Sequence, residues 1–206
     1  SQSKTCEAFA DPRVSEIGFD LWVPQSKRNL SIEEAKKLME QAPRGILKAI
    51  ISKDKNREEI LEYDKSLSPD LIQCHSKDII SIAQRMEPQI RKKMIIPIRI
   101  DNGHIREPFQ QISSLSSDIF AVLLDSSEGS GKNIDIKAAK ELITLFPHQR
   151  IIVAGGIGAH NIQIINQELA PYGIDSSSCL EVDGQKNNDM IRLFLKKSTK
   201  KKQYST

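Results

Sequence analysis

The stretch Arg150-Ile-Ile-Val-Ala-Gly-Gly-Ile157 contains four consecutive apolar residues followed directly by two glycines. A strand with only one buried face alternates apolar and polar residues, whereas a continuous apolar run is typical of a strand buried on both faces. Residues Ile119–Asp125 repeat the pattern, with an apolar run that ends in an acidic residue. The two stretches therefore predict strands of a parallel sheet that is covered by helices.

Five further strand-like runs extend this pattern along the chain. They are Gly18–Val23, Ile46–Ser52, Leu71–His75, Met94–Ile100 and Gly173–Cys179. The seven runs begin near residues 18, 46, 71, 94, 119, 150 and 173, so successive starts are 23 to 31 residues apart. This regular spacing fits one strand and one helix per unit and favours a (β/α)8 TIM-barrel-like fold of the α/β class.

Amphipathic stretches occupy the intervals between the strands. Ser31-Ile-Glu-Glu34 opens the first helix as a capping box, in which Ser31 caps the helix and Glu34 reaches back. The other helices are predicted at Arg57–Leu67, Lys77–Lys92, Ile134–Phe146, Asn161–Leu169 and Asp189–Lys197, with an irregular stretch after His104. We expect one domain over residues 1–197 and a Lys-rich flexible tail over residues 198–206.

Seven strands are readable, whereas a TIM barrel has eight. One interval back from residue 18 places the first strand near position −8, upstream of Ser1. Ser3–Pro12 would then be the end of the helix that follows this strand. The pattern therefore predicts that the first barrel strand is missing from this chain.

The distribution of charge argues against a nucleic-acid partner. The 206 residues carry 30 basic and 27 acidic side chains, a net charge of +3. Five lysines lie in the last eleven residues, which leaves 25 − 27 = −2 for the rest of the chain. A solvated, frayed tail is the simplest interpretation of these lysines, and a polyanion-binding arm is the alternative.

The cysteines and the hydropathy pattern indicate the compartment. Cys6, Cys74 and Cys179 form an odd set with neither a CxxC pair nor zinc-ligand spacing, so we expect reduced thiols and no metal site. No run approaches the roughly 18 apolar residues of a membrane span, and no secretory signal is present. We expect a cytoplasmic protein with no membrane partner.

The last two strands end in residues suited to phosphate binding. Gly155-Gly156 lets backbone N–H groups approach an anion, and Asn161 opens the next helix, whose N-terminus favours phosphate. Ser177 and Ser178 end the next strand, where a phosphate shared by the last two loops of a barrel would lie. Alternatively, these glycines and serines are ordinary turn residues.

Four polar residues at or beyond the ends of other strands join this candidate site. Asp125 is placed to act as a general acid at the edge of a dry cavity, or else to cap a loop or pair with Lys132. Arg28 can bind a carboxylate or phosphate through two hydrogen bonds, or lie on the surface. Gln73 and His75 lie two residues apart on one strand face, where a structural hydrogen bond is the alternative role.

Five ordered elements together are far more specific than any one of them. They are Gly18-Phe19-Asp-Leu-Trp-Val-Pro24-Gln-Ser26-Lys-Arg28, Ile72-Gln73-Cys74-His75-Ser76, Leu123-Leu124-Asp125…Gly129-Ser-Gly131-Lys132-Asn-Ile-Asp135, Ala154-Gly155-Gly156-Ile157-Gly-Ala-His-Asn161 and Ile174-Asp175-Ser-Ser177-Ser178-Cys179-Leu180-Glu181 with Gly184-Gln-Lys186. In this order they resemble the phosphoribosylanthranilate isomerase family of tryptophan biosynthesis, which are (β/α)8 barrels. The resemblance covers about residues 7 to 197.

The resemblance implies a cofactor-free Amadori rearrangement of N-(5′-phosphoribosyl)anthranilate from an aminoaldose to an aminoketose. It makes Asp125 the general acid that protonates the ribose ring oxygen. The substrate-binding residues that it implies are Arg28, Gln73 and His75, and the phosphate-binding ones are Gly155, Gly156, Ser177 and Ser178.

The general base of the family is a cysteine in a Lys-x-Cys-Gly element at the end of the first strand. Lys4-Thr5-Cys6-Glu7 is similar and makes Cys6 the candidate base. Cys6 lies only twelve residues before Gly18, however, whereas the other units span at least 23 residues, so a place inside the first helix is the other interpretation.

Three residues replace others that the family carries near its site: Cys179 and Ser76 replace glycines and Pro97 replaces a lysine. The alternative function is therefore a noncatalytic barrel that binds a phosphorylated sugar. The oligomeric state cannot be read from the sequence.

Overall fold

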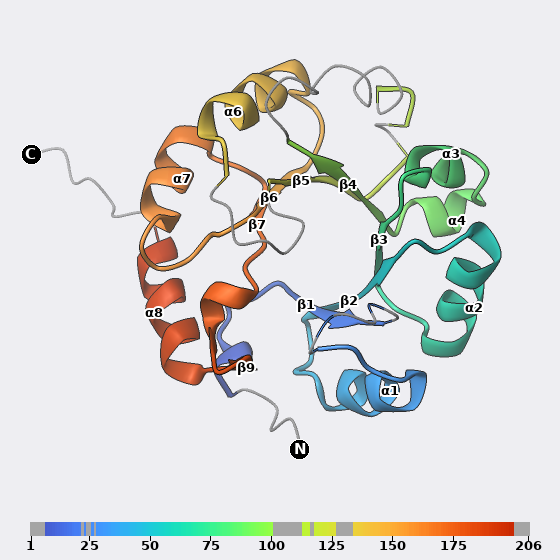
Figure 1. Ribbon diagram of the computed structural model, residues 1–206, viewed down its shortest axis with the longest axis horizontal. Helices are drawn as coiled ribbons and strands as arrows, with labels where there is room; N and C mark the ends of the chain where they lie inside the picture. Colours follow the sequence, from blue (N-terminus) through green and yellow to red (C-terminus); the bar gives the residue numbers. More distant parts are fainter. Residues whose placement is uncertain are drawn as a thin grey trace, which may run out of the picture.

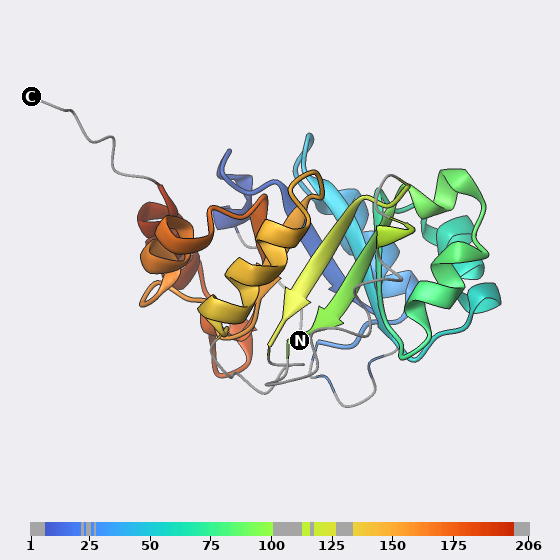
Figure 2. The same ribbon diagram turned by 90° about the horizontal axis from the view of Figure 1, so that it is seen from above.

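The computed structural model describes residues 7–21, 23, 26, 28–100, 113–115, 118–126 and 134–199. Its centre is a curved sheet of seven parallel strands, surrounded by helices on the outside (Figures 1 and 2). The strands are β1 (Glu16–Asp20), β2 (Leu47–Lys53), β3 (Leu71–His75), β4 (Met94–Arg99), β5 (Ala121–Asp125), β6 (Ile151–Ala154) and β7 (Gly173–Ile174). Each strand pairs with the next one in the chain, which confirms the TIM-barrel-like fold.

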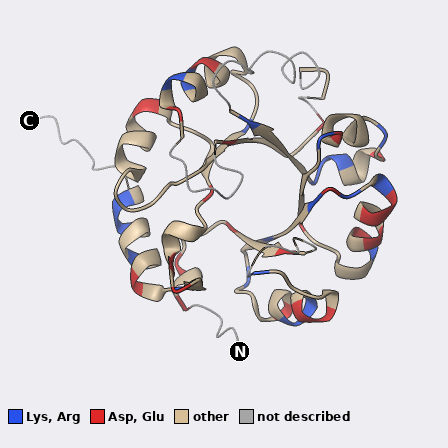
Figure 3. Ribbon diagram, in the orientation of Figure 1, with Lys and Arg blue, Asp and Glu red and all other residues tan. Residues whose placement is uncertain are grey.

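The helices lie between the strands, as the amphipathic pattern predicts. They are η1 (Glu7–Ala10), α1 (Ile32–Gln41), α2 (Arg57–Leu67), α3 (Ile79–Gln84), α4 (Pro88–Arg91), α6 (Ile136–Leu145), α7 (Ile162–Leu169), η2 (Ser178–Leu180) and α8 (Asn188–Ser198). The predicted capping box of Ser31 and Glu34 is present at the start of α1. Acidic and basic side chains are mixed along these outer helices (Figure 3).

Three predicted elements differ from the observed ones. The helix predicted at 77–92 is divided in two, because Pro88 lacks an N–H and begins α4 instead of continuing α3. The strand predicted at 173–179 ends after two residues, and η2 follows. Of the helix end predicted at Ser3–Pro12, residues 7–12 are described and contain the single turn η1, which packs on α8 through a hydrogen bond from Ala8 N to Asn188 Oδ1.

Two apolar layers fill the fold, because side chains alternate between the two faces of a strand. The larger layer lies between the sheet and the helices and includes Leu124, which is 1% exposed. The smaller layer lines the inner face of the sheet. It consists of Ala49, Leu71, Ile95, Ala121, Leu123, Ile152 and Ala154.

The sheet begins with β1 and ends with β7, and these two edge strands do not pair with each other in the described residues. No strand precedes β1 between residues 7 and 15, and residues 1–6 lie outside the described residues. The missing first strand therefore stays a prediction. The predicted tail also stays a prediction, because residues 200–206 lie outside the described residues and α8 ends at Ser198.

None of the described helices is long and apolar enough to cross a bilayer.

Candidate active site

A cavity of about 110 Å³ lies at the carboxyl ends of β5, β6 and β7. These ends lie side by side because Asp125 pairs in register with Ala154, and Val153 with Ile174. The lining residues come from the three strand ends, from the loops after them and from the loop after β1. They are Arg28, Asp125, Ala154, Gly155, Gly156, Ile157, Asp175, Ser176, Ser177, Ser178 and Cys179.

Two carboxylates line this cavity from different strands. Asp125 ends β5 two residues after Leu123, which belongs to the inner apolar layer, so its side chain lies on the inner face of the sheet. Asp175 follows β7 two residues after Gly173, where an added Cβ would contact inner-layer Ile152 at 3.4 Å. The same alternation therefore directs the side chains of Asp125 and Asp175 toward the same interior.

Backbone conformation shapes the loop after β6. Gly155 and Gly156 have φ values of 104° and 58°, in the region that favours glycine. The side chain of Asn161 holds the loop, since Oδ1 accepts from Gly158 N at 2.9 Å and Nδ2 donates to Gly156 O at 3.0 Å. An added Cβ on Gly158 would lie 2.9 Å from Cβ of Cys179, so the loops after β6 and β7 approach each other closely.

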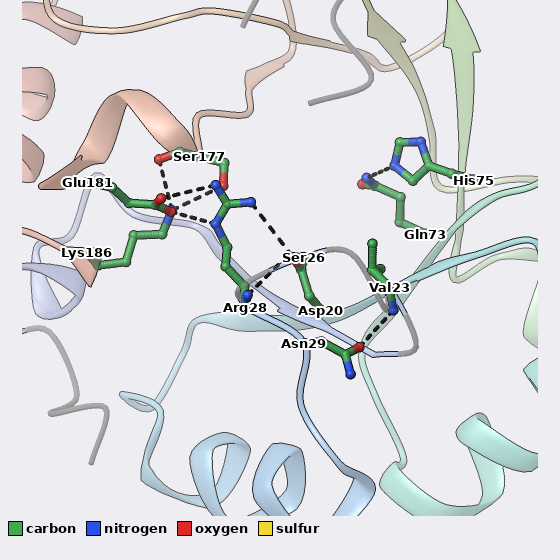
Figure 4. Close-up of polar contacts among 10 residues, drawn as sticks. All are labelled: Asp20, Val23, Ser26, Arg28, Asn29, Gln73, His75, Ser177, Glu181 and Lys186. Carbon is green, nitrogen blue, oxygen red and sulfur yellow. Dashed lines mark hydrogen bonds and ion pairs between the residues drawn. The ribbon is translucent and has the colours of Figure 1, made fainter. Parts of the chain in front are cut away.

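Arg28 forms the centre of an ion-pair cluster beside the cavity (Figure 4). Its Nε lies 2.6 Å from Oε1 of Glu181 and its Nη2 lies 3.1 Å from Oε2, a bidentate arrangement. Asp20 lies 4.0 Å from Nη1, and Ser26 Oγ donates to Asp20 Oδ2 while accepting from the backbone N–H of Arg28. These contacts fix the guanidinium between the loop after β1 and Glu181.

Glu181 joins Arg28 to Lys186 through the hairpin of β8 (Glu181–Val182) and β9 (Gln185–Lys186). The hairpin turns at Asp183-Gly184, where both φ values are positive. Burial by itself would raise the pKa of Glu181, but hydrogen bonds from Arg28 and Lys186 lower it overall. Glu181 is therefore held as a carboxylate between two cations.

Lys186 also brings a positive charge to the loop after β7. Its Nζ donates to the carbonyl oxygen of Ser177 at 2.9 Å and to Ser177 Oγ at 3.2 Å. Ser177 and the following Ser178 are exposed at the cavity, so an anion bound by this loop would lie near the ammonium group.

Burial alters the acidity of two inner carboxyl groups. Burial raises the pKa of Asp175 to about 6, with a further rise from Asp125 and a smaller opposing effect of Lys186. Burial also raises the pKa of Glu16, on β1, to about 7, and Asp175 adds to this rise. No cluster of three or more His, Cys, Asp or Glu suited to a metal ion occurs in the described part of the chain.

The structure brings most of the residues predicted from the sequence into this cavity and leaves two apart. Those that line it are Arg28, Asp125, Gly155, Gly156, Ser177 and Ser178. Gln73 and His75 lie at the end of β3, where the side-chain amide of Gln73 is 2.8 Å from His75 Nε2, and they do not line this cavity (Figure 4). Cys6 and Lys132 lie outside the described residues, so the role of Cys6 and the Asp125–Lys132 pair stay predictions.

Asp175, Glu181 and Lys186 were not predicted as site residues from the sequence. Ile174-Asp175 repeats the Leu124-Asp125 pattern of an apolar residue followed by an acid at a strand end, which is a usable signal. Asp183-Gly184 likewise marks a hairpin turn that returns Lys186 toward Glu181.

Comparison with known proteins shows which family the sequence matches. The family model described as N-(5′-phosphoribosyl)anthranilate (PRA) isomerase matches residues 2–197. The enzyme of that name from Streptococcus pneumoniae is 30% identical over 198 residues, 96% of this chain and 91% of its own. The one from Listeria welshimeri is 28% identical over 190 residues, 92% of this chain and 90% of its own.

Solved structures of proteins with the same name share the fold. The phosphoribosylanthranilate isomerase from Thermotoga maritima, in a monomeric form, aligns with a TM-score of 0.77 at 20% identity, covering 95% of this chain and 94% of its own. The one from Thermus thermophilus aligns with a TM-score of 0.75 at 22% identity, with the same coverage of 95% and 94%. A third was solved with reduced 1-(o-carboxyphenylamino)-1-deoxyribulose 5-phosphate and has a TM-score of 0.73 at 21% identity, covering 89% and 87%.

Proposed function

The chain belongs to the N-(5′-phosphoribosyl)anthranilate isomerase family of tryptophan biosynthesis, and on this premise we propose that the cavity at the ends of β5, β6 and β7 binds and isomerises the phosphoribosyl substrate. The observation that carries the proposal is the wall shared by a buried carboxyl group, Asp125, and a loop suited to phosphate. The reaction requires an acid beside a phosphate-anchored sugar, and both features meet here.

The substrate phosphate binds between the loops after β6 and β7. Gly155 and Gly156 have no side chain to hinder close approach of an anion to the backbone N–H groups. Ser177 and Ser178 add hydroxyl donors from the facing loop, and Lys186 adds positive charge behind Ser177. The product analogue bound by the solved relative also carries a 5-phosphate, which supports an anion site of this kind.

The anthranilate carboxylate is the second anionic group of the substrate, and Arg28 is the cation on the cavity wall that is placed to bind it. Gln73 and His75 lie on β3, between β2 and β4 in the sheet, and remain candidates for binding the rest of the substrate. The guanidinium can exchange one of its two hydrogen bonds to Glu181 for a substrate oxygen, since it has five N–H donors.

Asp125 acts as the general acid. It donates a proton to the ribose ring oxygen, the bond from that oxygen to C1 breaks, and the nitrogen lone pair forms a C1=N iminium. Loss of the proton at C2 then gives an enolamine, and ketonisation gives the aminoketose. The chain needs a base for the C2 proton, and the resemblance assigns this step to Cys6.

The proposal is tested by following the fluorescence of freshly prepared phosphoribosylanthranilate with the chain and with Asp125→Asn. We expect turnover by the chain and a loss of about 10²-fold or more in kcat for the variant, because proton transfer of this kind typically contributes 10²–10⁴-fold. Circular dichroism should show that the variant keeps its fold. Equal turnover by both proteins would remove Asp125 from the mechanism.

The noncatalytic alternative makes a different prediction for the same proteins. The chain would bind the reduced product analogue without turning over the substrate, and Asp125→Asn would then change binding alone. We also propose a cytoplasmic location, supported by Cys74 and Cys179, which are both free thiols in the structure.

A further inference from the structure

One carboxylate, Glu181, accepts hydrogen bonds from both cations of the candidate site. Its Oε1 accepts from Arg28 Nε at 2.6 Å and from Lys186 Nζ at 2.8 Å, and its Oε2 accepts from Arg28 Nη2 at 3.1 Å. The Glu181 side chain is 8% exposed and lies behind the residues that line the cavity. We propose that Glu181 is a positioning residue that aims Arg28 at the substrate carboxylate and ties this cation to the loop that binds the 5-phosphate. This inference rests on the proposed function.

The main chain holds Glu181 at the end of the loop after β7. Its backbone N–H donates to the carbonyl oxygen of Ser178, so Glu181 is bonded directly to the loop proposed to bind the phosphate. The preceding residue, Leu180, is buried, and its carbonyl oxygen accepts from Asn187 N at 2.9 Å, which closes the base of the β8–β9 hairpin. A carboxylate on this anchored segment has a fixed position relative to the phosphate loop.

Arg28 comes from the opposite end of the sheet. It follows β1, whereas Glu181 follows β7, and these two edge strands do not pair with each other in the described residues. Within that part of the chain, therefore, no ladder of strand hydrogen bonds sets the distance between the loop after β1 and the loop after β7. The bidentate ion pair of Arg28 and Glu181 spans this interval (Figure 4). Side chains here do what backbone pairing does elsewhere in the sheet.

The ion pair with Glu181 leaves donors of Arg28 available to a ligand. A guanidinium carries five N–H groups, and Nε and Nη2 each use one of theirs on Glu181. Nη1 carries two more and lies 4.0 Å from Asp20 Oδ2, which is longer than a hydrogen bond. Two bonds to one carboxylate fix the plane of the guanidinium, and Arg28 lines the cavity. The remaining N–H groups are thereby directed toward a carboxylate that binds there.

The two cations depend on Glu181 to different degrees. Lys186 Nζ also donates to the carbonyl oxygen of Ser177 at 2.9 Å and to Ser177 Oγ at 3.2 Å. Within the described residues, the side-chain hydrogen bonds of Arg28 both go to Glu181. Without the charge of Glu181 between them, the two cations also repel each other. Loss of the carboxylate therefore releases Arg28, whereas Lys186 stays on Ser177 beside the phosphate loop.

Charge and position make opposite predictions for the loss of Glu181. A carboxylate near an anion site repels anionic ligands, so its neutralisation by itself tightens the binding of every phosphorylated ligand. Loss of the Arg28 position, in contrast, weakens the binding of those ligands alone that carry the second carboxylate. The direction of the change in Kd, compared between two ligands, therefore distinguishes the two roles.

The experiment measures, by fluorescence titration, the Kd of two ligands that differ in one group. They are the reduced product analogue and the corresponding phenylamino compound, which lacks the ring carboxylate. The variants are Glu181→Gln, Arg28→Ala and the double variant, with Asp183→Asn as the matched control. Asp183 is exposed at the turn of the same hairpin, and asparagine tolerates its positive φ of 51° as aspartate does. The control thus removes the same charge from the same hairpin.

We expect Glu181→Gln to weaken binding of the carboxylate-bearing analogue about tenfold and to leave the Kd of the phenylamino compound unchanged or lower. In the Arg28→Ala background, Glu181→Gln should cause no further loss of affinity for the analogue, because it acts through the guanidinium. Asp183→Asn should keep both Kd values within about twofold. In turnover assays Glu181→Gln should raise KM about tenfold with kcat within about threefold, since it removes binding shared by ground state and transition state.

Three results would overturn the inference. The first is tighter binding of both ligands by Glu181→Gln, because Glu181 would then act by its charge alone. The second is equal weakening of both ligands in a variant that keeps its circular dichroism spectrum, because Glu181 would then support the cavity as a whole. The third is a double variant whose loss of affinity is the product of the two single losses, because Glu181 would then act independently of Arg28.

The unaltered chain separates this inference from the proposed function. If the chain binds the analogue and Glu181→Gln binds it equally well, the inference fails and the proposed function stands. If Arg28→Ala binds both ligands as the unaltered chain does, the inference fails together with the carboxylate site, and the phosphate site stands. If the unaltered chain binds neither ligand, the proposed function fails and the inference fails with it.

Discussion

Glu16 provides a sharp test of the electrostatics inside the sheet. It lies on the inner face of β1, two residues before Gly18, where an added Cβ would collide with the Ile51 side chain. Burial, with a contribution from Asp175, raises its pKa from 4.5 to about 7. A carboxyl group in this position favours the protonated form in the folded protein.

The magnitude follows from linkage between protonation and folding. A rise from 4.5 to about 7 corresponds to a ceiling of about 3 kcal/mol in the free energy of unfolding. Because the pKa of Glu16 is raised in the folded state, its protonated form stabilises the folded protein. This contribution to the free energy of unfolding is fully present below pH 4.5 and is lost as the pH rises through 7. Glu16→Gln is uncharged at every pH, so it should be about 1–3 kcal/mol more stable than the unaltered chain at pH 8 and close to it at pH 4.5.

Urea unfolding followed by circular dichroism at pH 4.5, 6 and 8 measures this difference. Glu62→Gln is the matched control, because Glu62 is exposed on α2 and its replacement should shift stability by no more than about 0.5 kcal/mol. In the double variant Glu16→Gln/Asp175→Asn, the increase in the free energy of unfolding should be smaller than the sum of the increases in the two single variants. The reason is that Asp175 raises the pKa of Glu16. Parallel pH profiles for the unaltered chain and Glu16→Gln would refute the reasoning.

Three further substitutions test other contacts. Arg28→Ala should raise KM about tenfold or more with a smaller effect on kcat. Arg28→Lys should not restore the original KM, because lysine lacks the planar fork that makes two hydrogen bonds to Glu181. An unchanged KM in steady-state assays would place Arg28 outside the site. Lys186→Gln should weaken binding of the reduced product analogue several-fold in a titration, and equal loss at low and high salt would argue against a charge effect. Leu124→Ala should lower the free energy of unfolding by about 2–5 kcal/mol in urea, since the side chain is 1% exposed; a loss below about 1 kcal/mol would show that the core collapses around it.

Local sequence signals account for most of the secondary structure. The capping box at Ser31 forms as predicted, and α2 spans Arg57–Leu67 as the amphipathic pattern indicates. These features depend on residues within three or four positions of each other, so one stretch of sequence contains the whole interaction. The same locality explains why Pro88 could divide a helix that was predicted as continuous.

The strand ends of the candidate site are predictable for a related reason. Asp125, Gly155 and Gly156 each follow an apolar run, and the parallel arrangement brings such ends to one edge of the sheet. The short β7 was harder to predict from the sequence. Ser176 Oγ donates to the carbonyl oxygen of Ile157, so the segment after β7 bonds to a neighbouring loop and leaves the strand ladder early.

By itself, therefore, the sequence determined the order and kind of the elements, the family, and the strand ends where the cavity lies. Only the tertiary structure decided that Arg28 pairs with Glu181, 153 residues further along the chain, and that Asp175 and Asp125 share one cavity. The physical reason is that ion pairing and burial act over a few ångströms in space whatever the separation in sequence. The raised pKa values of Asp175 and Glu16 arise chiefly from desolvation, which exists only once the folded chain buries them.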